Sequence, residues 1–303
     1  MELNRIDFYT TSSNVFYGPV TSFEKADYAI LGVPFDRTST FRGGSRFAPN
    51  AIRQASLNIE TMSMRTNIDL EKVKIADLGD LVETTNVEEL IHRIRAVVGD
   101  VLRSAKLPIL IGGEHTLSLG AIQSLPKDAC VICFDAHLDL RDEYLGERVC
   151  HASFMRRVVE HIGSENVFQV GTRALSNDEY KFIQKTRMFY IPSQELYRRK
   201  VETSIKKITE ETMHFKKKYI TIDMDVLDPA FAPGVGNPEA DGISTTILLD
   251  ILSEICDSTV LGVDLVEVNP LFDHGQTSIA AARILFEVIA AIESSKLKLK
   301  KRS

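Results

Sequence analysis

The chain has 303 residues, of which 44% are hydrophobic and 26% are charged, with 17 glycines and 10 prolines. This is the composition of an ordinary globular protein, and it excludes disordered, collagen-like and fibrous proteins. The 36 basic and 42 acidic residues give a net charge of −6, which argues against a nucleic-acid-binding protein and favours small cationic partners. No stretch approaches the roughly 18 apolar residues of a membrane span, and MELNRIDFYT lacks an apolar leader, so we expect a cytoplasmic protein without membrane contact.

Eight short apolar runs predict β-strands, and amphipathic stretches between them predict helices. Several runs are apolar at both alternating positions, which is typical of strands covered on both faces in a parallel sheet. This pattern permits a (β/α)₈ barrel or an open sheet with helices on both faces. We find no linker or repeat, so we expect one domain over residues 1–303. In chain order, the predicted strands are 28–33, 74–78, 108–111, 129–134, 167–170, 187–191, 219–222 and 259–266, and the predicted helices are 87–105, 177–186, 199–212, 246–256 and 277–294.

The four cysteines are too few for a disulfide scaffold in a chain of this length. Cys130 and Cys133 form a C-x-x-C pattern inside an apolar run. Residues three apart on a strand point to opposite faces, so this pair is a poor zinc or redox site. We expect buried structural thiols.

Three predicted strands are each followed directly by a segment rich in Asp and His. In both candidate folds, the carboxyl ends of the strands form the ligand-binding edge. Alternate residues of an extended chain project to the same side, so D-A-H-L-D and D-M-D each direct their polar groups together. The four carboxylates and two imidazoles gathered in this way are His115, Asp135, His137, Asp139, Asp223 and Asp225.

This donor set predicts a metal centre. Carboxylate oxygen with some imidazole nitrogen suits Mn²⁺ better than Zn²⁺, Co²⁺ or Mg²⁺. The number of donors fits two cations that share bridging carboxylates and a bridging water, and such coordination makes hydroxide available near neutral pH. A single Asp after a strand is more often a cap or turn residue. No cap or core role explains six converging residues, because unpaired carboxylates would repel one another.

In their order along the chain, G-G-E-H, D-A-H-x-D and D-x-D-x-x-D-P resemble the signatures of the ureohydrolase family, which includes arginase and agmatinase. Segments 32–36, 42–49, 222–244 and 263–270 also resemble the family, so the resemblance spans about residues 28 to 290. Glu114 stands where many members have Asp, but this side chain is not a ligand in the family. The resemblance implies a single three-layer α/β/α domain with an eight-stranded parallel sheet, assembled as a homo-oligomer, a trimer or hexamer.

The resemblance also implies a role for each metal ligand. Asp135 and Asp223 would bridge two Mn²⁺ ions. One ion would be held by His115, Asp135, Asp139 and Asp223, and the other by His137, Asp135, Asp223 and Asp225.

Three catalytic residues follow from the same resemblance. Glu267 would hold the guanidinium nitrogens by charge-assisted hydrogen bonds. Asp139 would orient the metal-bridging hydroxide and pass its proton to the leaving amine. His151 matches the family's proton shuttle, a role suited by an ordinary pKa near 6.5. In contrast, we interpret Arg42, Arg46 and Arg173 as structural or interface ion-pair residues rather than substrate contacts.

For the substrate, the resemblance is closest to agmatinase, which hydrolyses agmatine to putrescine and urea; the alternative is arginase or another guanidino-acid ureohydrolase. Arginases hold the α-carboxylate of arginine with Asn and Ser in the loop after D-A-H-x-D, and loop 140–149 has no Asn, Ser or Thr. Arginases also have acidic residues after the matching G-x-R, where this chain has Ala174 and Ser176. The acidic residues of loop 140–149, Asp142, Glu143 and Glu147, are expected to attract a second cationic group of the substrate. In contrast, the loop arginines Arg141 and Arg148 can bind a carboxylate.

Two other classes of protein fit parts of this pattern. A metal amidohydrolase of the histone-deacetylase type shares the overall fold but keeps one catalytic metal, so the six ligands and Glu267 argue against it. A non-catalytic homologue is disfavoured because every proposed ligand is present.

Overall fold

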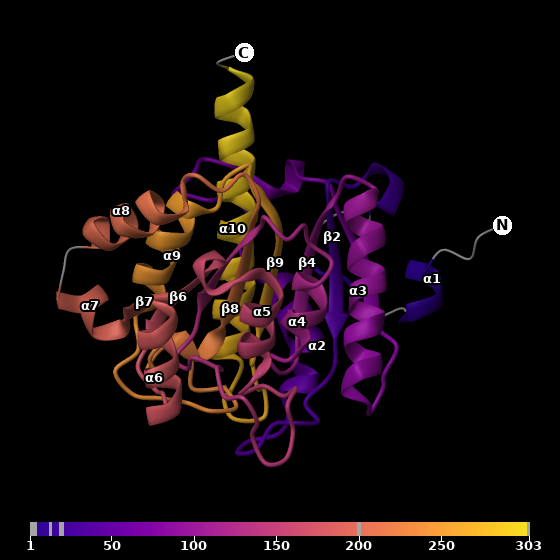
Figure 1. Cartoon of the computed structure of the whole chain (residues 1–303). Coiled ribbons are helices and arrows are strands. Elements are labelled where there is room, and N and C mark those ends of the chain that lie inside the picture. The colour runs from indigo at the N-terminus through magenta and orange to yellow at the C-terminus, as the bar shows by residue number, and fades with distance from the viewer. Residues whose placement is uncertain (1–4, 12–13, 18–20, 199–200, 302–303) are drawn as a thin grey trace.

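The computed structural model describes residues 5–11, 14–17, 21–198 and 201–301 (Figure 1). Nine strands in this part of the chain form one sheet in the order β1-β3-β2-β4-β9-β8-β5-β6-β7. Strands β2 to β9 pair in parallel, and β1 pairs antiparallel with β3 at one edge. The strands are β1 (Thr10–Thr11), β2 (Tyr28–Val33), β3 (Ile75–Leu81), β4 (Leu107–Gly112), β5 (Cys130–Phe134), β6 (Val167–Thr172), β7 (Phe189–Pro192), β8 (Lys218–Asp223) and β9 (Val260–Val266).

The predicted eight-stranded parallel sheet is confirmed, and each predicted run falls on one of the strands β2 to β9. The sheet is open rather than a barrel, because β1 and β7 lie at opposite edges without pairing to each other. The additional strand, β1, is two residues long. A segment of that length carries no periodic pattern, so the sequence could not reveal it.

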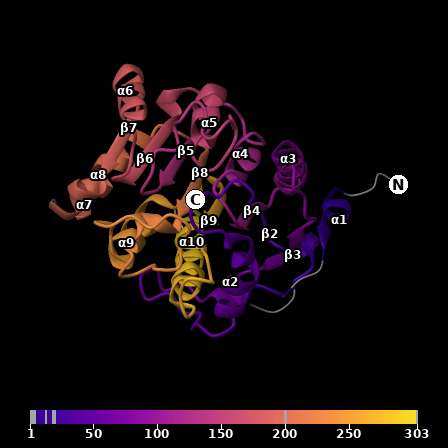
Figure 2. The same cartoon turned by 90° about the horizontal axis from the view of Figure 1, so that it is seen from below.

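Helices cover both faces of the sheet (Figure 2). The five predicted helical stretches are confirmed as α3, α6, α8, α9 and α10, although residues 199–200 of the predicted 199–212 lie outside the described residues. The other helices are five to nine residues long, too short for a clear helical period. Among the described residues, no helix is long and apolar enough to cross a membrane. The helices are α1 (Arg5–Tyr9), α2 (Ala48–Ser56), α3 (Val87–Arg103), α4 (Leu117–Ile122), α5 (Phe154–Ile162), α6 (Asn177–Thr186), α7 (Ser193–Arg198), α8 (Val201–Thr212), α9 (Thr245–Ile255) and α10 (Gln276–Lys300).

Two hydrophobic cores lie on opposite faces of the sheet. In β2, Tyr28 and Ile30 pack into the core that includes residues of α2, α9 and α10, whereas Ala29 and Leu31 pack into the core that includes residues of α3, α4 and α5. This alternation explains why the strands are apolar at successive positions, and it gives the predicted three layers. Cys130 and Cys133 likewise fall in opposite cores as free thiols, so the burial expected for them is confirmed.

Four central strands bring their carboxyl ends together. β9 inserts between β4 and β8, and β8 in turn pairs with β5. The register places Phe134 beside Ile222 and Asp223 beside Val266, so the segments that follow these strands emerge at the same level. This edge of the sheet is where an open parallel sheet binds its ligands.

Candidate active site

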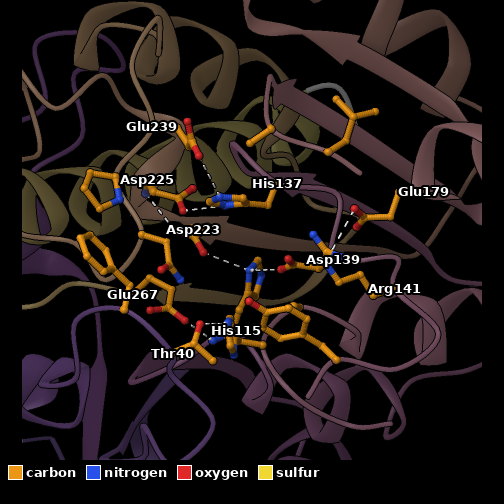
Figure 3. Close-up of a pocket in the computed structure, with 18 of the residues that line it drawn as sticks. Thr40, His115, His137, Asp139, Arg141, Glu179, Asp223, Asp225, Glu239 and Glu267 are labelled. Carbon is orange, nitrogen blue, oxygen red and sulfur yellow. Dashed lines mark hydrogen bonds and ion pairs between the residues drawn. The ribbon is translucent and has the colours of Figure 1, made fainter. Parts of the chain in front are cut away.

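A cavity of about 620 Å³ opens at the carboxyl ends of the central strands (Figure 3). Five of the six predicted metal ligands line it, together with His151 and Glu267. The sixth, Asp135, is fully buried beneath it. The structure therefore brings all of the predicted site residues together at one place. We call this region, formed by the six predicted ligands and Glu267, the buried end of the cavity.

The first group of donors surrounds His115, whose side chain is 1% exposed. Its Nδ1 atom lies 3.0 Å from Oδ2 of Asp135, 3.2 Å from Oδ2 of Asp223 and 3.6 Å from Oδ2 of Asp139. Nδ1 forms no hydrogen bond within the described chain despite being buried. These four residues are the set that the resemblance assigns to one metal ion.

The second group surrounds His137. Its Nδ1 atom lies 2.9 Å from Oδ2 of Asp225 and 3.6 Å from Oδ1 of Asp135. Asp135 thus directs one carboxylate oxygen toward each histidine, which is the geometry of a bridging ligand. The ligand atoms of Asp135, His137 and Asp225 are close enough to hold one ion.

Backbone hydrogen bonds fix the inner oxygens of the aspartates. Oδ1 of Asp135 accepts from the N–H of His137 at 2.6 Å, and Oδ1 of Asp223 accepts from the N–H of Asp225 at 2.8 Å. Oδ1 of Asp225 accepts from the N–H of Ala136 at 3.1 Å, which ties the β5 and β8 segments together. The turn role and the ligand role considered from the sequence are therefore compatible, because each aspartate has a second oxygen that faces the cluster.

A buried chain of hydrogen bonds orients His115. Its Nε2 lies 2.8 Å from Oγ1 of Thr221, and this hydroxyl donates to Oδ1 of Asp264 at 2.5 Å. Tyr219 donates to the other oxygen of Asp264 at 2.8 Å. Because the hydroxyl of Thr221 donates to a carboxylate, Nε2 must carry the proton, which leaves the Nδ1 lone pair directed at the aspartates. Sequence reasoning missed this support, although a carboxylate inside the apolar strand β9 was a signal for it.

Crowding raises the pKa of two carboxyls in the cluster. Burial and the charge of Asp135 raise the pKa of Asp139 well above its ordinary value. Burial and the charges of Asp225 and Asp135 do the same for the pKa of Asp223. The cluster cannot carry its full negative charge without a positive partner, and a bound cation would supply one.

Glu267 begins the loop after β9 and is 5% exposed. Its backbone donates to the carbonyl of Gly113 at 2.8 Å, and its Oε1 accepts from the N–H of His115 at 2.9 Å. Burial and the charge of Glu114 raise the pKa of Glu267 to about 8. Glu267 and Asp139 also adopt left-handed φ angles of 64° and 52°. A side chain in this conformation is strained, and such strain concentrates at functional sites.

His151 faces the cavity and is mostly buried. Its Nδ1 lies 3.1 Å from Oγ1 of Thr38, and its Nε2 lies 3.4 Å from Oγ1 of Thr40. Burial lowers the pKa of His151 to about 4. The imidazole is therefore neutral at pH 7 and available as a proton acceptor.

The opposite end of the cavity, which we call the open end, is charged and is formed by loop residues together with Glu179 of α6. Oε1 of Glu239 lies 3.9 Å from Nε2 of His137, and this glutamate side chain is 47% exposed. The guanidinium of Arg141 lies 5.0 Å from the ring centre of Tyr144, and its Nε is 4.0 Å from Glu179. Sequence reasoning missed both glutamates: a loop that no motif marks brings Glu239 to the cavity, and Glu179 lies in the first turn of α6.

The acidic loop residues expected to attract a second cation lie outside the cavity wall. Asp142, Glu143 and Glu147 are absent from the described lining of the cavity. Asp142 instead lies 2.6 Å from Arg157 and 3.5 Å from Arg148. Neighbouring arginines therefore hold Asp142 in surface ion pairs, and the attraction of a second cation by this loop stays a prediction.

The three arginines interpreted as structural differ in their contacts. Nε of Arg46 donates to Asp36 at 2.5 Å, as an ion-pair residue should. Arg173 lines the cavity but donates to backbone carbonyls, among them that of Glu239 at 2.9 Å. Arg42 lies against the rings of Phe41 and Phe272 rather than in an ion pair.

The fold and the site define the class of protein. An open parallel sheet whose central strands end in paired aspartates and histidines, beside a buried glutamate, is the architecture of a ureohydrolase. The chain belongs to the Arginase family, whose sequence model matches residues 26–291.

Individual proteins of this family are similar to the chain over most of its length. The chain is 37% identical to the agmatinase of Bacillus anthracis over 285 residues, which cover 92% of this chain and 96% of that protein. It is 32% identical to the mitochondrial guanidino acid hydrolase of Homo sapiens, over 90% of this chain and 80% of that protein. Among solved structures, the agmatine ureohydrolase of Thermoplasma volcanium superposes with a TM-score of 0.87 at 35% identity, covering 92% of this chain and 94% of that one.

Proposed function

We propose that this ureohydrolase is an agmatinase, which hydrolyses agmatine and one water to putrescine and urea with two Mn²⁺ per subunit. One observation carries the proposal: Asp135 lies between two imidazoles, with a different oxygen directed at each. The similarity to proteins named agmatinase supports the choice of substrate.

The residues of the buried end fit two such cations. The unbonded Nδ1 of His115 and the outward carboxylate oxygens form a set of nitrogen and oxygen donors that suits Mn²⁺. When bound there, the cations would make a water-derived nucleophile available at neutral pH. The residues that would hold them are His115, Asp135, Asp139 and Asp223 for one ion, and His137, Asp135, Asp223 and Asp225 for the other.

Glu267 is the residue we assign to the guanidinium. Its carboxylate is buried, and burial and Glu114 raise its pKa to about 8, so its charged form lacks a positive partner. A guanidinium provides that charge and presents parallel N–H donors to the two oxygens. Glu267 would therefore hold the guanidinium carbon beside the Asp and His cluster.

Asp139 and His151 would carry the protons. Asp139 lies 3.6 Å from Nδ1 of His115 at the edge of the cavity, where it can accept a proton from the attacking water and pass it to the leaving nitrogen. His151, neutral at pH 7, would exchange protons between this site and solvent.

The open end would select the remainder of the substrate. Glu179 is already occupied, because its two oxygens accept from the N–H groups of Leu140 and Ser176. Arg173 is likewise occupied by carbonyls. Glu239 keeps an exposed carboxylate, which can pair with the distal ammonium of agmatine.

Arg141 supports a second candidate, hydrolysis of a guanidino acid. Its guanidinium lines the same open end and can pair with a substrate carboxylate. Urea release from agmatine, arginine and 4-guanidinobutyrate, measured side by side, decides between them. We expect the highest kcat/KM with agmatine, and equal or better turnover of either carboxylate-bearing compound would overturn the agmatinase assignment.

We also propose that residues 1–303 form one ureohydrolase domain in a cytoplasmic homo-oligomer, a trimer or hexamer. The family match over residues 26–291 and the single continuous sheet support one domain. Light scattering coupled to gel filtration measures the assembly, and a monomeric mass would overturn the homo-oligomer.

A further inference from the structure

We propose that Glu114, acting through the hydroxyl of Thr38, holds His151 as the Nδ1–H tautomer and directs its Nε2 lone pair into the cavity. This makes Glu114 and Thr38 positioning residues for proton transfer. The inference rests on the proposed function of His151, and it concerns residues to which no role has been assigned.

Glu114 is fully buried and accepts four hydrogen bonds. Its Oε2 accepts from the backbone N–H groups of Thr38 at 2.7 Å and Ser39 at 3.2 Å. Its Oε1 accepts from the hydroxyls of Thr38 and Thr116, both at 2.6 Å. The glutamate therefore fixes the 38–39 loop against the loop that follows β4, and it determines where the hydroxyl of Thr38 points.

The tautomer of His151 follows from counting protons on that hydroxyl. A hydroxyl has one proton and two lone pairs, and the proton of Thr38 is directed at Glu114. One lone pair accepts from the backbone N–H of His151 at 3.1 Å. Nδ1 of His151, also 3.1 Å away, therefore meets the second lone pair, so Nδ1 must be the donor.

The contacts at Nε2 agree with this assignment. With the proton on Nδ1, Nε2 has a free lone pair, and the hydroxyl of Thr40 lies 3.4 Å from it. Tyr144 packs its ring edge-to-face against the imidazole, with ring centres 6.0 Å apart, which restricts rotation of the ring. His151 thus presents a base rather than an N–H donor to the cavity.

A double-mutant cycle tests the relay. T38V removes the hydroxyl at nearly constant size, and we expect kcat to fall about tenfold with KM within about twofold, a part of the 10²- to 10⁴-fold that general acid–base groups contribute. T38S keeps the hydroxyl and should restore kcat. In an H151N background, T38V should change kcat by less than about twofold, because the group through which it acts is gone. An equal loss of kcat in the wild-type and H151N backgrounds, or no loss of kcat in the wild-type background, would overturn the relay.

Ser39 provides the matched control. Its hydroxyl forms no hydrogen bond within the described residues, so S39A tests the general sensitivity of the loop and should leave kcat near that of the wild type. Metal content, measured for every variant, should stay at the wild-type value. A kcat for S39A as low as that of T38V would show that the loop, rather than the hydroxyl, is responsible.

A second measurement does not depend on turnover. Solid-state NMR of protein labelled with ¹⁵N at the histidine rings, and loaded with diamagnetic Zn²⁺, distinguishes protonated from unprotonated ring nitrogens. The signal lost in H151N identifies His151. A protonated Nδ1 supports the relay, and a protonated Nε2 overturns it. This result is independent of activity. Failure to release urea from any guanidino compound would instead refute the proposed function.

Discussion

The two ends of the active-site cavity are built in different ways. At the buried end, residues directly after β4, β5, β8 and β9 converge, and backbone N–H groups fix the inner oxygens of Asp135, Asp223 and Asp225. At the open end, Glu239 and Arg141 lie on loops, are partly exposed and lie 3.9 Å and 4.0 Å from their charge partners among the described residues. A rigid buried end suits a single kind of reaction. A loosely held open end can be altered to accept a different substrate. Relatives of this chain include proteins named agmatinase and guanidino acid hydrolase.

The largest effect is expected for Asp135→Asn, at the centre of the buried end. A bridging ligand serves both cations, so the substitution should remove most bound Mn²⁺ and reduce kcat by on the order of 10³-fold, which corresponds to roughly 4 kcal/mol. Metal analysis together with urea release measures both quantities. Two tightly bound metals and normal turnover in this variant would refute the metal centre.

Glu267→Gln should separate substrate binding from metal binding within the buried end. The amide keeps the size of the side chain but removes the charge that faces the guanidinium. We expect kcat/KM to fall about 10²-fold, comparable to roughly 3 kcal/mol of transition-state stabilisation, with metal content intact. A kcat/KM near that of the wild type would exclude Glu267 from the guanidinium site.

Thr221→Val tests whether the rigidity of the buried end extends beyond the ligands. Loss of the hydroxyl between His115 and Asp264 frees the imidazole to change tautomer, and loss of such a support weakens metal binding by about 10- to 100-fold. Calorimetric titration of the metal-free variant with Mn²⁺ measures the change in Kd. An unchanged Kd would show that the aspartates alone orient His115.

Glu239→Gln should have the smallest effect, because this carboxylate is half exposed and solvent screens its charge. We expect KM for agmatine to rise by up to about fivefold with kcat unchanged. Arg141→Gln serves as the control of opposite charge and should not raise KM for agmatine. If Glu239→Gln instead reduces kcat by 10²-fold or more, the open end takes part in the reaction and the two ends are not separable.

Most of the sheet could be predicted because each central strand is apolar at successive positions, as Tyr28 to Val33 illustrates. The predicted ligands lie in short motifs in which a spacing of two residues directs side chains to one side. Such local patterns need no knowledge of how distant segments meet. The two-residue strand β1 and the short helices were missed because they contain too few residues to show a period.

The supporting contacts could not be predicted because they depend on register. Thr221 and Asp264 are direct partners across β8 and β9, and the sequence does not specify that alignment. Glu114 meets Thr38 only because the loops after β2 and β4 pack together. Glu239 reaches His137 on a long loop after β8 whose path no motif marks.

The position of β9 has a consequence for the synthesis of the protein. This strand lies between β4 and β8 in the middle of the sheet, yet its residues leave the ribosome after those of every other strand in the described chain. Until Val260–Val266 arrives, the facing edges of β4 and β8 are open to other chains. Nascent chains stalled just before residue 259 should therefore aggregate more readily than chains extended past residue 270, a difference that sedimentation of the stalled products can measure. The last strand to be made completes the sheet and also delivers Glu267, so an incomplete chain cannot carry a finished active site.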